Sequence, residues 1–226
     1  MNRKEKLVTE QIYHVYNRGV EKRIIFTYEH DYRRFIDCAF HYLFSNERYS
    51  DAVNSLENGL TTTFREVTSR NEAEDFVRPV DIIAYCLMPN HIHFLVKQLV
   101  DRGISKYVHK ISTSFTNYFN LKYDRVGSLF QGPFKYKRIE TEEQLLYLTK
   151  YIHRNPLEII RGADSTFGLG DYPWSSLPAY LGTVEEPLLK ELVLASYPSV
   201  EAYRNFVAEE DIPNKVEGLG YLNLES

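Results

Sequence analysis

The stretch V-D-I-I-A-Y-C-L-M-P-N-H-I-H-F-L-V-K-Q-L, residues 80–99, decides the fold of this chain. Its two halves, Val80–Met88 and His91–Leu99, are rich in β-branched and aromatic residues, which favours strands. Pro89 and Asn90 lie between the halves, and both residue types favour turns. The stretch therefore predicts a β-hairpin.

Two histidines, His91 and His93, stand two positions apart in the second half of this hairpin. Alternate side chains of a strand point to the same face of its sheet, so both imidazoles would project side by side. They would form half of a site for a divalent metal ion, and a third protein ligand has to come from elsewhere. Taken alone, such a pair is more often two ordinary polar residues on a half-exposed strand.

Further strands and helices surround the hairpin. Alternating residues predict two more strands, and apolar residues at helical spacing predict three helices. The predicted strands are Gln11–Arg18 and Phe134–Ile139, and the predicted helices are Asp31–Phe44, Ile104–Tyr123 and Thr141–Arg154. Thr141 with Gln144 three residues on is typical of a capping box. The order β-α-β-β-α-β-α predicts an α+β, ferredoxin-like (RRM-like) fold, an antiparallel sheet with helices packed on one face.

The remaining segments predict how the chain is divided. We expect one core domain over residues 1–182, in which the polar segment 45–79 is a possible insertion and the glycine-rich segment 162–172 is a linker. We expect residues 183–226 to form an acidic C-terminal extension of short helices. This extension would pack on the core through Leu188, Leu192, Leu194 and Phe206.

The composition excludes several classes of protein. The 226 residues contain no run of about 18 apolar residues, so no membrane-spanning helix is expected. The first residues, M-N-R-K-E-K-L, lack the apolar stretch of a signal peptide. The two cysteines, Cys38 and Cys86, suggest neither a disulfide framework nor a metal-type pair. A reducing, cytoplasmic compartment fits this pattern best.

The net charge of −4 is unevenly distributed. Residues 183–226 hold nine acidic and three basic residues, a net charge of −6, which leaves +2 for residues 1–182. Residues 122–138 hold five basic residues against one acidic residue, a net charge of +4. Such a basic strip suits the binding of phosphate groups, although by itself a solvated surface explains it equally well.

The helix predicted to end near Arg154 offers the missing metal ligand. Tyr151 and Asn155 are four residues apart, which places them on one face of a helix. Asn155 can give a carbonyl oxygen to the metal, whereas His153 faces roughly the opposite side. A phenol one turn from a metal ligand suggests nucleophilic attack on a phosphate that the metal orients. Tyr147 is the alternative nucleophile, but no Asn or Gln follows it four positions on.

Five motifs of the chain resemble those of the HUH-type single-tyrosine (IS200-like) transposases, in their REP-associated tyrosine transposase branch. They are Y-H-V-Y-N-R-G (13–19), M-P-N-H-I-H-F-L-V (88–96), G-S-L-F-Q-G-P-F-K (127–135), Y-I-H-R-N-P (151–156) and D-Y-P-W-S-S (171–176). The resemblance covers roughly residues 11–182, with the motifs in the family's order. The segment L-E-I-I-R-G, which follows Asn155-Pro156, departs from the Ala-Gly step that the family more usually has.

This resemblance implies an activity and the residues that perform it. Tyr151 would be the nucleophile, and His91, His93 and Asn155 would hold Mg²⁺ or Mn²⁺. The substrate would be single-stranded DNA with a short hairpin, formed by palindromic repeats. Cleavage would leave a 5′-phosphotyrosine and a free 3′-OH. The protein would act as a monomer or as a homodimer, in which the helix bearing Tyr151 could be exchanged between protomers.

Seven polar residues are candidates for contacts with the DNA, although each one alone is more often an ordinary surface residue. They are Asn17, Arg18, Arg125, Gln131, Lys135, Lys137 and Arg138. Some of the many aromatic residues, among them 18 tyrosines, would stack on unpaired bases. We expect the histidines at positions 14, 41 and 109 to be structural.

Two other functions stay open on the sequence alone. One is a domesticated protein that binds structured single strands without cutting them, although the complete set of two histidines, tyrosine and asparagine argues against it. The other is a metal-dependent hydrolase in which Tyr151 is only structural.

Overall fold

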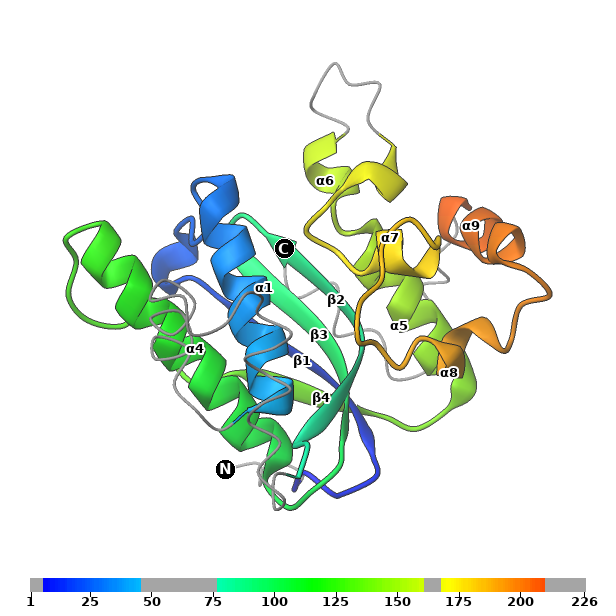
Figure 1. Ribbon diagram of the computed structural model, residues 1–226, viewed down its shortest axis with the longest axis horizontal. Helices are drawn as coiled ribbons and strands as arrows, with labels where there is room; N and C mark the ends of the chain where they lie inside the picture. Colours follow the sequence, from blue (N-terminus) through cyan, green and yellow to red (C-terminus); the bar gives the residue numbers. More distant parts are fainter. Residues whose placement is uncertain (1–5, 46–76, 161–167, 210–226) are drawn as a thin grey trace, which may run out of the picture.

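The computed structural model describes residues 6–45, 77–160 and 168–209 (Figure 1). Most of the possible insertion at 45–79, part of the glycine-rich segment and the end of the C-terminal extension lie outside the described residues. The major strands and helices of the described part follow the predicted order β-α-β-β-α-β-α, with short helices after them.

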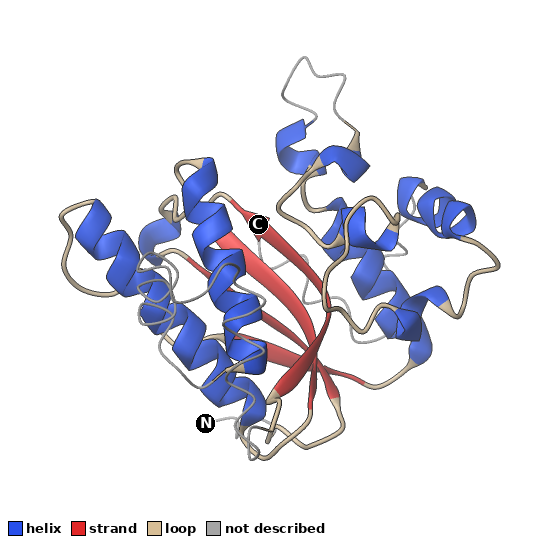
Figure 2. Cartoon of the chain, viewed as in Figure 1, coloured by secondary structure: helices blue, strands red, loops and turns tan. Residues whose placement is uncertain are grey.

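A four-stranded antiparallel sheet forms the centre of the fold (Figures 1 and 2). Its strands are β1 (Ile12–Arg18), β2 (Val80–Met88), β3 (His91–Gln98) and β4 (Lys135–Ile139), in the spatial order β2-β3-β1-β4. β2 and β3 form the predicted hairpin, and each neighbouring pair of strands is antiparallel. The four predicted strands are thus confirmed to within one residue at each end.

Helices α1 (Glu29–Phe44) and α4 (Gly103–Lys122) cover one face of the sheet (Figure 1). Phe35 of α1 joins the two layers, with its ring centroid 6.2 Å from that of Phe94 in β3 and 5.1 Å from that of Phe115 in α4. Both helices were predicted, because their apolar residues recur at helical spacing. The burial of this apolar surface stabilises the layer.

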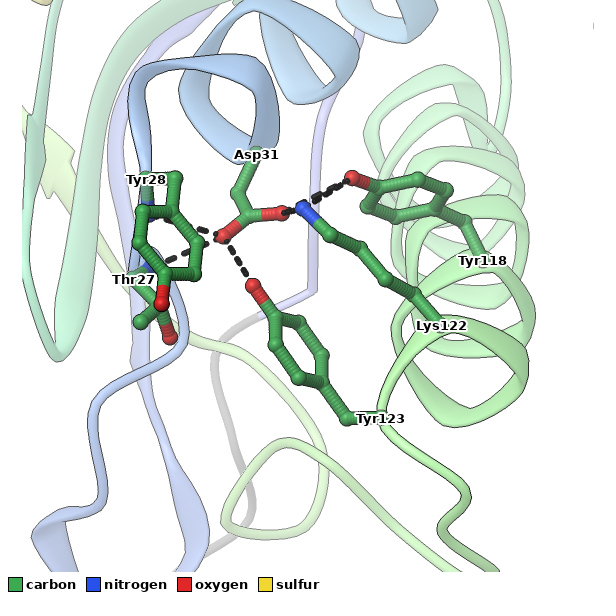
Figure 3. A network of polar contacts seen from close by, with 6 residues as sticks. All are labelled: Thr27, Tyr28, Asp31, Tyr118, Lys122 and Tyr123. Atoms are coloured by element: carbon green, nitrogen blue, oxygen red, sulfur yellow. Dashed lines mark hydrogen bonds and ion pairs between the residues drawn. The ribbon is translucent and has the colours of Figure 1, made fainter.

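A buried carboxylate ties the start of α1 to the end of α4 (Figure 3). Asp31 accepts hydrogen bonds from the backbone N–H groups of residues 27–28, at 2.9 and 3.0 Å, and so caps α1. It also accepts from Lys122 at 2.6 Å, from Tyr118 at 2.8 Å and from Tyr123 at 2.7 Å. Burial would raise the pKa of Asp31, but these donors together outweigh it and lower the pKa to about 2. Lys122 belongs to the basic strip, and Asp31 therefore neutralises part of the charge of that strip.

Helix α5 (Glu142–Arg154) lies on the opposite face of the sheet, against β2 and β3 (Figure 1). The expectation of helices on one face thus holds for α1 and α4, whereas α5 departs from it. The alternation of side chains along β3 explains the arrangement, because Phe94 contacts α1 while His93 contacts Tyr151 of α5. β3 is therefore covered on both sides.

The predicted N-cap of α5 is confirmed, with one difference in the capping box. Oγ1 of Thr141 accepts the N–H of Gln144 at 3.1 Å. The Gln144 side chain accepts the N–H of Glu140 at 2.8 Å and not that of Thr141, so the returning bond is shifted by one residue. Two side chains therefore fix the start of the helix that carries Tyr151.

Short helices complete the described part of the chain. They are η1 (Val20–Lys22), α6 (Leu157–Ile160), η2 (Leu169–Asp171), α7 (Leu177–Tyr180), α8 (Glu191–Leu194) and α9 (Val200–Ala208). Leu188 is buried, and Leu194 and Phe206 pack against the core as predicted. The prediction for Leu192 was wrong, since it is 41% exposed and Val193 is the buried residue of α8. Leu192 is rotated by about 100° around the helix axis from Val193 and faces away from the core.

Within the described ranges, no helix combines the length and the apolar character needed to cross a bilayer.

Candidate metal and nucleophile site

Strand β3, one of the two central strands of the sheet, carries the two predicted histidines at its N-terminal end. His91 pairs with Arg18 of β1, and His93 pairs with Tyr16. The ring centroids of the two histidines lie 5.0 Å apart. Directly paired residues of antiparallel strands share a face of the sheet, so Arg18 and Tyr16 flank the histidines on that face. We call it the histidine face.

Helix α5 brings Tyr151 and Asn155 to the same place. The rings of Tyr151 and His93 meet edge to face, with their centroids 5.8 Å apart. Oδ1 of Asn155 lies 3.4 Å from Nε2 of His91, and Nδ2 of Asn155 donates to the carbonyl of Tyr151 at 3.1 Å. The structure therefore brings together all four residues that the sequence singled out, from β3 and α5 of one chain.

Hydrogen bonding decides which nitrogen of His91 carries its proton. Nδ1 of His91 lies 2.6 Å from Oδ1 of Asn90, and Nδ2 of Asn90 donates to the carbonyl of Lys22 at 3.4 Å. Because Oδ1 of Asn90 can only accept, the single proton of the neutral imidazole belongs on Nδ1. Nε2 of His91 and Oδ1 of Asn155 are then two acceptors that face each other. A cation between them would stabilise this arrangement.

The donor set fits a divalent cation. Two ligands of one metal ion lie about 3 to 3.5 Å apart, given metal–ligand distances of about 2.1 Å. The 3.4 Å between His91 and Asn155 falls in this range. Across the described residues, no group of three or more His, Cys, Asp or Glu side chains gathers as a metal site. An amide oxygen, and not a carboxylate, would therefore complete this one.

Burial favours the neutral form of the histidines around this site. It lowers the pKa of His91, an effect partly offset by Asn155 and Glu158. Burial is also the main cause that holds the pKa of His93 well below its usual range. The same cause lowers the pKa of His14, which lies behind His93, to about 3. Only a neutral imidazole binds a metal, so the site suits a cation at neutral and mildly acidic pH.

Two other candidates on α5 lie away from the histidine face. His153 is fully buried, and its ring nitrogens lie 2.7 Å from the hydroxyl of Tyr203 and 2.8 Å from Oγ of Ser176. Tyr147 packs against Phe206 of α9, with ring centroids 5.6 Å apart. Both side chains therefore contact C-terminal segments of the chain.

Four of the seven candidate DNA contacts lie near the site. Lys135 pairs with Tyr16 and Lys137 lies two residues on, so both exposed lysines project from β4 on the histidine face. Nζ of Lys135 lies 5.9 Å from the ring centroid of Tyr16. Arg18 projects from β1 on the same face, and its Nε donates to Oε1 of Gln131 at 2.5 Å.

The other three candidates lie elsewhere. Asn17 projects from β1 on the opposite face, where it lines a groove of about 580 Å³ beside α4. Arg138 also projects on that face and donates to Oε1 of Gln11 at 2.6 Å. Arg125 follows α4 and donates to Oδ1 of Asn120 at 3.1 Å.

Two residues that contact the histidine pair were missed by sequence reasoning. The sequence predicts Asn90 only as a turn residue, but its side chain contacts His91. The sequence predicts only a structural role for His14, but its Nε2 lies 2.9 Å from Nδ1 of His93. The available signal was the even spacing of His14 and Arg18, which places both side chains on one face of their strand. This spacing does not show which strand lies beside them, so the contact between His14 and His93 could not be predicted.

The fold and the site together define an α+β protein in which a His-x-His strand faces a helix with a tyrosine and an asparagine. The family model of IS200-like transposases matches residues 34–155, more than half of the chain and a range that contains His91, His93, Tyr151 and Asn155. The chain belongs to this family.

A solved structure shares the fold. It is the structure of a REP-associated tyrosine transposase bound to a REP hairpin, with 14% sequence identity and a TM-score of 0.52. The match covers 80% of this chain and 85% of the other. None of the curated proteins compared with the chain matches it.

Proposed function

We propose that this chain is a metal-dependent endonuclease and strand transferase that acts on single-stranded DNA containing a hairpin. The observation that carries this proposal is the position of Tyr151, whose ring meets His93 edge to face one turn before Asn155. A hydrolase that activates water needs no tyrosine there. A phenol beside a metal site can instead hold one end of a broken strand covalently and conserve the bond energy for rejoining.

The side chains of His91, His93 and Asn155 would hold the divalent cation. When bound, Mg²⁺ or Mn²⁺ would polarise an oxygen of the scissile phosphate. The phenol oxygen of Tyr151 attacks phosphorus and forms a phosphoester bond, while the bond between phosphorus and the 3′ oxygen breaks. The phenol proton passes to solvent and the departing 3′ oxygen takes up a proton. The products are a 5′-phosphotyrosine and a free 3′-OH.

The basic side chains of the histidine face would bind the strand on either side of the scissile phosphate. Arg18, Lys135 and Lys137 supply three cations around the ring of Tyr16. Cations bind the phosphates of any sequence, and an aromatic ring gives an unpaired base a surface to stack on. This combination suits the single strand beside a hairpin, where phosphates and unpaired bases are both accessible.

One chain is sufficient to build the proposed site. His93 and Tyr151 meet within the same chain. The end of α5 is also bound to a later segment of the same chain. Arg154 donates to the carbonyls of residues 207, 208 and 209 at distances between 2.7 and 3.0 Å. Exchange of α5 between two protomers without residues 207–209 would require these bonds to break. We therefore expect the monomer to be competent.

A cleavage assay with a labelled single strand tests the proposal. An oligonucleotide that contains a hairpin and carries a label at its 3′ end is incubated with the protein and Mn²⁺. The products are then separated on a denaturing gel. The label marks the fragment that would stay attached to tyrosine through its 5′ phosphate. We expect a protein–DNA adduct that Tyr151→Phe abolishes and that Tyr147→Phe, the matched control on α5, leaves intact.

Other results of this assay would support the alternatives. Cleavage that survives Tyr151→Phe would indicate a hydrolase in which Tyr151 is structural. Binding of the hairpin without any cleavage by the wild-type protein would indicate a domesticated binding protein. Either result contradicts the proposal.

A further inference from the structure

His14 is a fully buried histidine that contacts a candidate metal ligand. It projects from β1 beside His93, and its Nε2 lies 2.9 Å from Nδ1 of His93. The two imidazoles are nearly parallel, with centroids 5.1 Å apart and an interplanar angle of 10°. On its other side, the His14 ring stacks on Tyr16 at 4.9 Å. The contact between the two nitrogens is therefore held in place by packing.

The role of this contact can be inferred from the way in which histidines bind metal ions. One ring nitrogen offers its lone pair to the metal, and the other carries the proton and usually donates it to a neighbouring acceptor. Such an acceptor fixes both the tautomer and the orientation of the ring. For His91 the acceptor is Oδ1 of Asn90, at 2.6 Å. For His93 the group in the corresponding place, at Nδ1, is Nε2 of His14.

We propose that His14 is a positioning residue, which accepts the Nδ1 proton of His93 and so presents Nε2 of His93 to the metal ion. This inference rests on the metal site of the proposed function. Nε2 of His14 would not bind the metal ion itself, because it points at His93. The histidine face would thus hold two ligand histidines, each kept in the same tautomer by a different acceptor.

Two substitutions of His14 separate this role from simple packing. His14→Gln keeps an acceptor oxygen near the position of Nε2 but loses the aromatic ring. His14→Phe keeps a ring that can stack on Tyr16 but has no acceptor. A packing role predicts that Phe is the better replacement in the buried site, whereas the positioning role predicts that Gln is the better one.

Mn²⁺ affinity, measured by calorimetric titration of the full chain without DNA, is the readout. We expect His14→Phe to weaken Mn²⁺ binding by about 10- to 100-fold, the usual effect of losing an outer-shell partner. We expect His14→Gln to stay within a few-fold of the wild type. His109→Phe is the matched control, since His109 is an exposed histidine of α4. Circular dichroism without metal shows that each variant is folded.

The same substitution in a protein that already lacks the His93 side chain tests whether His14 acts through His93. In a His93→Ala protein, His14→Phe should cause no further loss of Mn²⁺ affinity, because the side chain that it positions is gone. The inference is overturned if His14→Phe binds Mn²⁺ as tightly as the wild type, or more tightly than His14→Gln. Wild-type binding of Mn²⁺ that is insensitive to Asn155→Ala and His93→Ala would instead overturn the metal site of the proposed function.

Discussion

Asn155 shows how one side chain can serve both the helix and the proposed site. It stands at the end of α5, directly before a proline, where asparagine is a common helix-ending residue. Its Nδ2 donates to the carbonyl of Tyr151 at 3.1 Å, and this bond turns Oδ1 toward His91. The amide is therefore oriented by the helix before any metal binds.

The amide oxygen of Asn155 is expected to contribute directly to metal binding. Asn155→Ala removes one of three donors and should weaken Mn²⁺ binding by at least about 10-fold. Asn155→Asp should retain binding, because a carboxylate is a good ligand for Mn²⁺ and Mg²⁺. Calorimetric titration compares the variants, with Asn117→Ala on the exposed side of α4 as the control. Unchanged affinity in Asn155→Ala would exclude the amide as a ligand.

At the scale of elements, the basic residues of β4 lie on two different faces of the sheet, because side chains alternate along a strand. Lys135 and Lys137 are exposed on the histidine face, whereas Arg138 projects on the opposite face and donates to Gln11. Adjacent residues of one basic strip therefore have different surroundings. Net charge along the sequence cannot show this difference, because it does not record the direction of the side chains.

Neighbouring substitutions in β4 test which face binds DNA. Lys137→Ala should weaken binding of a hairpin-bearing single strand and reduce the slope of log affinity against log salt by about one, through loss of a phosphate contact. Arg138→Ala should leave that slope nearly unchanged. Fluorescence anisotropy over a range of salt concentrations measures both. A larger effect of Arg138→Ala would place the DNA on the α1 and α4 face.

The elements themselves could be predicted from local sequence. The hairpin at 80–99 and the amphipathic spacing of α4 are patterns within one segment, so their bounds were predicted to within about a residue. The face that α5 covers depends on strand order and could not be predicted in this way. The contact between His14 and His93 joins residues 79 positions apart, through the register of β1 and β3. Sequence reasoning thus predicted four side chains that the structure brings together, and it missed His14 and Asn90, which contact the histidine pair.

At the scale of the whole molecule, we expect the proposed site to be assembled within one chain, and this can be tested by mixing variants. A His93→Ala protein and a Tyr151→Phe protein each lack one part of the site. If α5 were exchanged between protomers, a mixed dimer would contain one complete site and regain activity. We expect no recovery of DNA cleavage on mixing, because β3 and α5 of the same chain form each site. Recovery above the sum of the separate activities would show assembly in trans.

Buried neutral histidines make the stability of the molecule depend on pH. Burial lowers the pKa of His14 and of His153 from 6.5 to about 3. Below about pH 6.5 the unfolded chain binds protons at these positions and the folded chain does not, so stability falls as the pH drops toward 3. Each histidine contributes up to roughly 1.4 kcal/mol per pH unit.

Urea unfolding at pH 7 and pH 5 measures this dependence. We expect the free energy of unfolding to be lower at pH 5 by a few kcal/mol. The pKa of Asp31 is about 2, below the usual value of 3.8. This carboxylate therefore lowers the free energy of unfolding only below about pH 4, outside the range of the measurement. Burial raises the pKa of Glu186 to about 7, and this carboxyl opposes the histidines between pH 7 and pH 5, so the measurement is made in a Glu186→Gln background. Equal free energies at the two pH values in that background would contradict neutral buried histidines.

The covalent bond to Tyr151 is the central claim of the proposed function, and mass spectrometry of the DNA adduct tests it most directly. Trypsin separates the two candidate tyrosines, since Tyr147 falls in peptide 139–150 and Tyr151 in peptide 151–154. After nuclease digestion of the attached strand, the phosphonucleotide mass should remain on peptide 151–154. The same mass on peptide 139–150, or cleaved DNA with no modified peptide, would contradict the account.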